Sequence, residues 1–210
     1  MLRIWLVTGL IFFITAASAS DDKFLVDGEN LFYDSEKSTS IEEEGINWAD
    51  VDTFERILKA NPAVKLLTLN SSGGDLEAAQ YMADLTIDFE LNTNVRGSCE
   101  SACTLIFLGG ETRTVERGSW LGFHQSYWDA SYIEEYFNDN KDTNAWADPF
   151  EFASWLYEDT QNEILARLQY FVERKVDAAF AIKTMRATAD DMWYPRRKEL
   201  TKAGVINAER

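Results

Sequence analysis

Three short segments of the sequence hold residues whose types and positions suit acyl chemistry. Ser101 opens an apolar run, where the free N–H groups at a helix start would stabilise a developing negative charge. Gly73 and Gly74 follow a strand-like segment and leave their N–H groups approachable, as an oxyanion requires of its donors. His124 ends another strand-like segment and is the single histidine of the chain, so it is the only imidazole available as a base. Taken one at a time, these residues also fit a helix cap, a capped turn and a structural histidine.

Two cysteines, Cys99 and Cys103, stand on either side of Ser101 and are the only ones in the chain. No cluster of further Cys or His accompanies them, so the sequence predicts no metal site. They form either a local disulfide or a pair of buried free thiols, and the disulfide is favoured if the chain is exported. Such a bond closes a very small loop, so its expected effect is to stiffen one turn.

The first nineteen residues have the pattern of a secretory signal. Arg3 is followed by a long apolar run that ends in the small residues Ala17, Ser18 and Ala19. This pattern predicts a signal peptide over residues 1–19, cleaved before Ser20, and a periplasmic or secreted protein. The alternative is a retained membrane anchor formed by residues 4–19.

Composition indicates one folded, acidic domain after this segment, over residues 20–210. The chain has 210 residues, of which 46% are hydrophobic and 13% aromatic, which is enough apolar surface to bury a sizeable core. Its formal net charge of -16 would repel nucleic acids and anionic lipid headgroups, so neither is an expected partner.

Helical and strand-like patterns alternate along this domain, which predicts an α/β fold with a largely parallel sheet. Strands are expected over residues 24–33, 64–70 and 91–95, and residues 112–124 are expected to form two strands joined by a turn around Arg117 and Gly118. Helices are expected over 48–60, 76–89, 102–108, 150–183 (one long or two consecutive helices) and 196–202. A last strand could include Val205 and Ile206.

Residues 127–148 form an acidic, aromatic segment without a sustained period, and we interpret it as a surface insertion. It either presents its rings to a partner or packs down on its own domain. The rings concerned are those of Tyr127, Trp128, Tyr132, Tyr136, Phe137 and Trp146.

The order of the motifs resembles that of a known family. The motifs are Asn70-Ser-Ser-Gly-Gly, Gly97-x-x-x-Ser101-Ala, Gly110, Gly122-Phe-His124-Gln125, and Trp193-Tyr-Pro followed by Gly204-Val-Ile. Over residues 67–206 the chain resembles the proteolytic subunit of Clp proteases and its relatives in the crotonase-like superfamily. The resemblance implies a ClpP/crotonase-like fold of repeated ββα-type units, with a mostly parallel sheet flanked by helices.

The resemblance also implies roles for individual residues. Ser101 would be the nucleophile and His124 the general base, with the N–H groups of Gly73 and Ala102 forming the oxyanion hole.

The third catalytic member is where the sequence departs from the family. A gapless match puts Ala187 or Thr188 where the family has an aspartate, and two aspartates lie close by. Asp191 is the favoured partner of the imidazole and Asp190 the alternative. If neither reaches His124, a Ser–His dyad or an inactive site is left. The family proline of the glycine turn is also replaced, by Ser72.

The expected protein is therefore an exported serine hydrolase that cleaves short or unfolded peptides through an acyl-enzyme. It would need no cofactor, and because export separates it from ATP, no ATP-dependent unfoldase is expected as a partner. Family members assemble into rings or stacked trimers, so the resemblance implies a homo-oligomer. The alternative is a catalytically inactive Clp-like scaffold or binding module in the periplasm.

Overall fold

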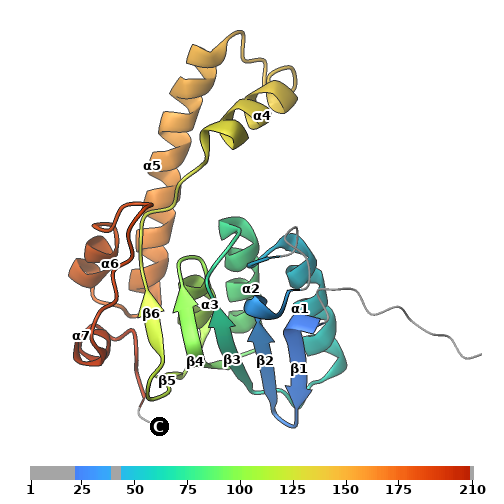
Figure 1. Cartoon of the computed structure of the whole chain (residues 1–210), viewed down its shortest axis with the longest axis vertical. Helices are drawn as coiled ribbons and strands as arrows, with labels where there is room; N and C mark the ends of the chain where they lie inside the picture. The colour runs from blue at the N-terminus through green and yellow to red at the C-terminus, as the bar shows by residue number, and fades with distance from the viewer. Residues whose placement is uncertain (1–21, 39–43, 209–210) are drawn as a thin grey trace, which may run out of the picture.

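The computed structural model describes residues 22–38 and 44–208 (Figure 1). The predicted signal segment, residues 1–19, lies outside the described residues. Among the helices that are described, none is both long and apolar enough to cross a bilayer.

A six-stranded, mostly parallel sheet forms the centre of the fold, as predicted. Its strands are β1 (Phe24–Asp27), β2 (Asn30–Asp34), β3 (Leu66–Ser71), β4 (Asn92–Glu100), β5 (Arg113–Val115) and β6 (Trp120–Gly122). The order is β1-β2-β3-β4-β5, and β6 also pairs with β4. Only the β1–β2 pair is antiparallel. The predicted α/β class with a mostly parallel sheet is therefore confirmed.

Strand β4 has two successive neighbours on the same side. Its first half, from Thr93 to Val95, pairs with β5, and its last residues, from Ser98 to Glu100, pair with β6. Because β3, β4 and β6 run parallel, their carboxyl ends lie at one edge of the sheet. The segments that follow these three ends carry the glycine turn, Ser101 and His124.

Three helices pack side by side on the sheet: α1 (Trp48–Ala60), α2 (Leu76–Asp88) and α3 (Cys103–Gly109) (Figure 1). Helix α1 begins with a capping box between Asn47 and Asp50, and the Asp75 side chain caps α2 by accepting from Ala78 N. All seven residues of α3 are buried, so this short helix belongs to the core.

The chain after β6 builds an arm that extends beyond the sheet. Helix α4 (Ala130–Asn140) lies beside the first half of the 25-residue helix α5 (Pro149–Glu173), at an angle to it (Figure 1). We call α4, residues 141–148 and the first half of α5 the arm. The Tyr136 ring stacks on Trp155 at 6.0 Å between centroids, and Phe152 is only 3% exposed. Part of the aromatic segment thus packs on α5, whereas Tyr127 and Tyr132 keep 58% and 50% of their surface exposed.

Two short helices, α6 (Ala178–Thr184) and α7 (Arg197–Lys202), complete the fold. Val205 and Ile206 are buried but do not form the expected strand. Instead, the Val205 carbonyl accepts a hydrogen bond from the Arg113 side chain at 3.0 Å.

Candidate active site

Ser101 occupies a tight turn between β4 and α3. Its φ is +52°, a left-handed conformation that costs a non-glycine residue about 1 kcal/mol. The turn is fixed by a hydrogen bond from Ser101 N to the Gly122 carbonyl at 2.9 Å, and by another from Thr104 Oγ1 to the Ser101 carbonyl at 2.7 Å. Backbone strain of this kind is often found where a side chain must be presented in one orientation.

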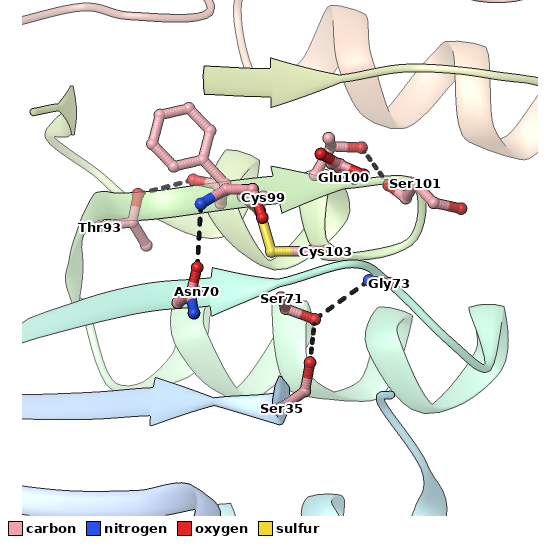
Figure 2. The surroundings of a disulfide bond; sticks show 12 residues. Ser35, Asn70, Ser71, Gly73, Thr93, Cys99, Glu100, Ser101 and Cys103 are labelled. Atoms are coloured by element: carbon pink, nitrogen blue, oxygen red, sulfur yellow. Dashed lines mark hydrogen bonds between the residues drawn. A yellow bond between two sulfur atoms is a disulfide. The ribbon is translucent and has the colours of Figure 1, made fainter. Parts of the chain in front are cut away.

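The predicted disulfide is confirmed and brackets this turn. Cys99, near the end of β4, is bonded to Cys103, the first residue of α3 (Figure 2). Both cysteines are fully buried, whereas Ser101 between them is partly exposed. The disulfide therefore holds the backbone on both sides of the serine.

The structure brings Ser101 and His124 together. Ser101 Oγ lies 2.6 Å from His124 Nε2. His124 follows β6, and its neighbour Phe123 forms a two-bond bridge with Trp193, which anchors the segment. When Nε2 carries no proton, the hydroxyl donates to it, which is the arrangement of a serine and its general base.

The surroundings of His124 favour the neutral imidazole. The pKa of the side chain lies below its ordinary value of 6.5, first because the ring is partly buried and second because Arg167 is positively charged. The backbone of Ala189 and the charge of Glu100 act in the opposite direction. An imidazole that stays neutral at neutral pH can accept the serine proton.

No carboxylate orients this imidazole within the described part of the chain. His124 Nδ1 is buried and has no hydrogen-bond partner there; the nearby Ala189 backbone falls short of hydrogen-bond geometry. Asp190 and Asp191 are both exposed, and Asp191 Oδ1 instead accepts from Met192 N at 2.8 Å. The expected contact from either aspartate is therefore not made.

The reason lies in how the segment after α6 passes the histidine. Its backbone faces the β6 extension: the Ala187 carbonyl accepts from Gln125 N at 2.9 Å, and the Met185 carbonyl accepts from Gln125 Nε2 at 2.8 Å. The two aspartates come after this contact, in a turn closed by the bond from Asp191 N to the Thr188 carbonyl.

Gly73 lies directly against the serine. A Cβ atom at this position would be 2.8 Å from Ser101 Cβ and 3.3 Å from Ala102 N, and φ is +109°. Only glycine combines that backbone conformation with so close an approach. The hydrogen bonds of the described residues leave the Ala102 N–H free at the start of α3, so one oxyanion donor is available beside Ser101.

The second expected donor is engaged elsewhere. Gly73 N donates to Ser71 Oγ at 3.1 Å, and Ser71 Oγ accepts in turn from Ser35 Oγ at 2.7 Å (Figure 2). Ser72 N donates to Glu36 Oε1 at 2.9 Å, a bond that a proline at this position could not make. The short helix η2 (Ser35–Lys37) thus holds the glycine turn in a form with only half of the oxyanion hole open.

The other side of the glycine turn is fixed by a buried ion pair. Lys23 Nζ lies 2.8 Å from Asp50 Oδ2 and also donates to the Gly45 carbonyl at 2.7 Å. The next residue, Ile46, donates to the Gly73 carbonyl and accepts from Asp75 N, both at 2.8 Å.

A cavity of about 810 Å³ opens beside the Ser101–His124 pair. Its walls come from the beginnings of α2 and α3, from the segment after β6, and from α4 and α5. The cavity includes five aromatic residues of the segment and the arm, namely Tyr127, Trp128, Tyr132, Tyr136 and Trp155.

Arg167 is a site residue that the sequence analysis missed. It lines the cavity from α5 and its charge acts on His124. A signal was present, because Arg167 stands three residues after Ile164 and four before Phe171, on the apolar stripe of the helix. A cation on the inward-facing stripe of a helix is uncommon unless it has a specific partner, so its position is a signal.

Comparison with known proteins gives the fold. No protein-family model matches the sequence, and no curated protein matches it. Among solved structures, ClpP1 from Listeria monocytogenes is similar with a TM-score of 0.54 and 16% identity, over 77% of this chain and 84% of that one. A peptidase from Plasmodium falciparum gives 0.53 and 13%, over 78% and 90%.

A mutant of the membrane-bound stomatin-specific protease 1510-N, in complex with a substrate peptide, gives a TM-score of 0.53 and 19% identity, over 78% of this chain and 69% of that one. At such low identity the likeness concerns the fold alone. The chain therefore has a ClpP-like fold, and its structure is similar to those of ClpP and related serine peptidases.

Proposed function

We propose that this protein is a serine hydrolase that cleaves peptide bonds in short or unfolded peptides. The observation that carries the proposal is the 2.6 Å approach of Ser101 Oγ to His124 Nε2 beside an open cavity. The ClpP-like fold supports a peptide as the substrate, because the similar solved structures include peptidases.

The geometry supports an acyl-enzyme route. His124 Nε2 takes the hydroxyl proton as Ser101 Oγ attacks the carbonyl carbon, and the Ala102 N–H stabilises the oxyanion. The Gly73 N–H becomes a second donor to the oxyanion once its hydrogen bond to Ser71 Oγ breaks. The imidazolium then protonates the leaving amine, and water hydrolyses the acyl-serine by the reverse use of the same groups.

The proposed catalyst is a Ser–His dyad. Loss of the orienting carboxylate slows a Ser–His–Asp enzyme by up to about 10⁴-fold, because the imidazole tautomer is no longer held. Here neither Asp190 nor Asp191 contacts His124, so neither can hold its tautomer. Replacing either aspartate by asparagine should therefore change the rate of acylation less than about threefold.

We further propose that the protein works outside the cytosol, in the periplasm or after secretion. The signal-like residues 1–19 and the disulfide beside Ser101 both support an oxidising compartment. Such a location implies action without ATP or an unfoldase. N-terminal sequencing of the mature protein tests it, with Ser20 as the expected first residue. Self-association is a further expectation of the ClpP-like fold, and sedimentation velocity measures it.

A second candidate function is a non-catalytic binding module. Two observations favour it: His124 Nδ1 has no carboxylate partner in the described chain, and the Gly73 N–H is bonded to Ser71. In this case the cavity would bind a peptide without cleaving it.

Covalent labelling distinguishes the two functions. A fluorophosphonate should label the purified protein at Ser101, with labelling abolished in Ser101→Ala and strongly reduced in His124→Ala. Ser154→Ala is the matched control, because that serine is exposed on α5 and does not line the cavity. Absence of labelling in a sample that circular dichroism shows to be folded would contradict the hydrolase and favour the binding module.

A further inference from the structure

The cavity beside Ser101 has an unusual combination of walls, carboxylates and aromatic rings. Asp75 and Glu77 contribute carboxylates from the beginning of α2, and Asp129 and Asp159 contribute them from the arm side. The same cavity is lined by rings of the arm and of the segment that leads to it. Two of these rings are well exposed, Tyr127 at 58% and Tyr132 at 50%.

Most of this negative charge is not neutralised within the described chain. Arg167 is the one Lys or Arg among the cavity residues, and Glu163 is the carboxylate whose charge acts on it. Glu77, Asp129 and Asp159 take part in no side-chain hydrogen bond or ion pair among the described residues. The cavity therefore has an excess of carboxylates over cations.

Carboxylates at the start of α2 act on a ring of the arm that lines the same cavity. The pKa of Tyr132, on α4, is raised first by burial and then by the charges of Asp75, Tyr136 and Glu77. Asp75 and Glu77 belong to the start of α2, and Tyr132 belongs to α4, so the charges of one element act on a ring of the other. A group bound in this cavity would lie near both carboxylates and aromatic rings.

We propose that this cavity binds a cationic side chain, lysine or arginine, of the peptide substrate. The inference rests on the proposed function and specifies its substrate class. An ammonium or guanidinium group is attracted both by carboxylates and by the faces of Trp and Tyr rings. The aliphatic stem of the same side chain packs against apolar surface while the charge stays among the carboxylates.

The position of Arg167 determines where the cation lies. Arg167 acts on His124, so a second positive charge beside the catalytic pair would be repelled. The cation is therefore placed towards the arm, near Asp159 and the exposed ring of Tyr132. A long side chain such as lysine or arginine separates its charge from the scissile carbonyl, as this arrangement requires.

Binding to the Ser101→Ala variant tests the proposal without depending on catalysis. Three unstructured Ala/Gly peptides that differ at one central residue, lysine, norleucine or glutamate, would be compared by isothermal titration calorimetry. The lysine peptide should bind about tenfold more tightly than the norleucine peptide, and the glutamate peptide more weakly than both. Equal affinity for lysine and norleucine, or no measurable binding of the lysine peptide, would overturn the inference.

A pair of charge variants locates the site. Asp159→Asn, in the Ser101→Ala background, should remove most of the preference for lysine. Asp139→Asn makes the same change on an exposed residue of α4 that does not line the cavity, and should keep the preference. Loss of preference in both variants would indicate a diffuse field instead of a site and would overturn the proposal.

The outcomes of this test and of the labelling experiment are independent. Labelling of Ser101 without a lysine preference would leave the hydrolase standing and reject the cation site. A lysine preference without labelling would reject hydrolysis and assign the cavity to a binding module for cationic peptides.

Discussion

At the scale of single residues, His124 must be neutral to accept the serine proton, and the structure contains the groups that keep it so. Partial burial and the charge of Arg167 both lower the pKa of the imidazole. No carboxylate of the described chain accepts a hydrogen bond from Nδ1, so the charge of Glu100 is the carboxylate influence that opposes this lowering. The base should therefore remain active at a lower pH than an ordinary histidine would allow.

The pH dependence of labelling checks this electrostatic role. In the wild type, the fluorophosphonate labelling rate should rise with pH through a midpoint below 6.5, because the proton leaves His124 at that pKa. Arg167→Met removes a neighbouring positive charge, so the pKa of His124 rises and the midpoint moves to higher pH. Arg167→Lys keeps the charge and should keep the midpoint. Identical midpoints in the wild type and Arg167→Met would contradict the role.

Ser71 is the residue that controls the second oxyanion donor. Ser71→Ala removes the acceptor of the Gly73 N–H and should free that group for the oxyanion. Since one such donor is worth about 10²-fold or more in rate, we expect labelling to become at least about tenfold faster. Ser72→Ala is the control, because only its backbone N–H takes part in the turn. A folded Ser71→Ala protein with unchanged or slower labelling would show that the Ser71 bond does not restrain the site.

At the scale of elements, the sheet positions the site, and the side chain of Arg113 connects two helices to the C-terminal segment. The carboxyl ends of β3, β4 and β6 carry the three catalytic segments to one edge. Elsewhere, Arg113 of β5 donates to the carbonyls of Gly110, Arg174 and Gly204 at 2.8 to 3.0 Å. One side chain thus ties the end of α3, the end of α5 and the C-terminal segment together.

Replacement of Arg113 should therefore affect stability. The side chain is only 3% exposed, and burial together with the charge of Arg174 lowers its pKa to about 10. Arg113→Ala leaves several carbonyls unsatisfied and should reduce the free energy of unfolding by about 3 kcal/mol, measured by urea denaturation. Arg117→Ala, in an exposed turn, should change it by less than about 0.5 kcal/mol. An Arg113→Ala protein as stable as the Arg117 control would contradict this structural role.

At the scale of the whole molecule, the net charge of -16 favours cationic over anionic ligands. Salt should weaken this long-range attraction, since the screening length falls from about 10 Å at 0.1 M to about 3 Å at 1 M. Binding of the lysine peptide should therefore weaken as salt is raised, whereas that of the norleucine peptide should change little. Titrations at both ionic strengths measure this, and an equal response of the two peptides would contradict it.

Much of the fold could be predicted because local patterns are strong. The helix expected over residues 48–60 matches α1, since its apolar spacing and the capping residue Asn47 act within one segment. Residues 24–33 were expected as one strand but form a hairpin turned at Gly28, whose φ is +59°. Helix α4 was not predicted, because its rings are partnered by α5 across space and produce no regular period along the sequence.

The sequence by itself determined which residues could react: one histidine, one serine at the opening of an apolar run, and a pair of glycines after a strand. The tertiary structure decided which of them meet. It placed His124 on Ser101, left Asp190 and Asp191 in solvent, and bonded Gly73 to Ser71. Composition and local spacing are properties of neighbouring residues. The Ser101–His124 contact instead joins residues 23 apart, and the turn that bonds Gly73 to Ser71 is held by Ser35, 36 residues before Ser71. Only packing brings such distant segments together.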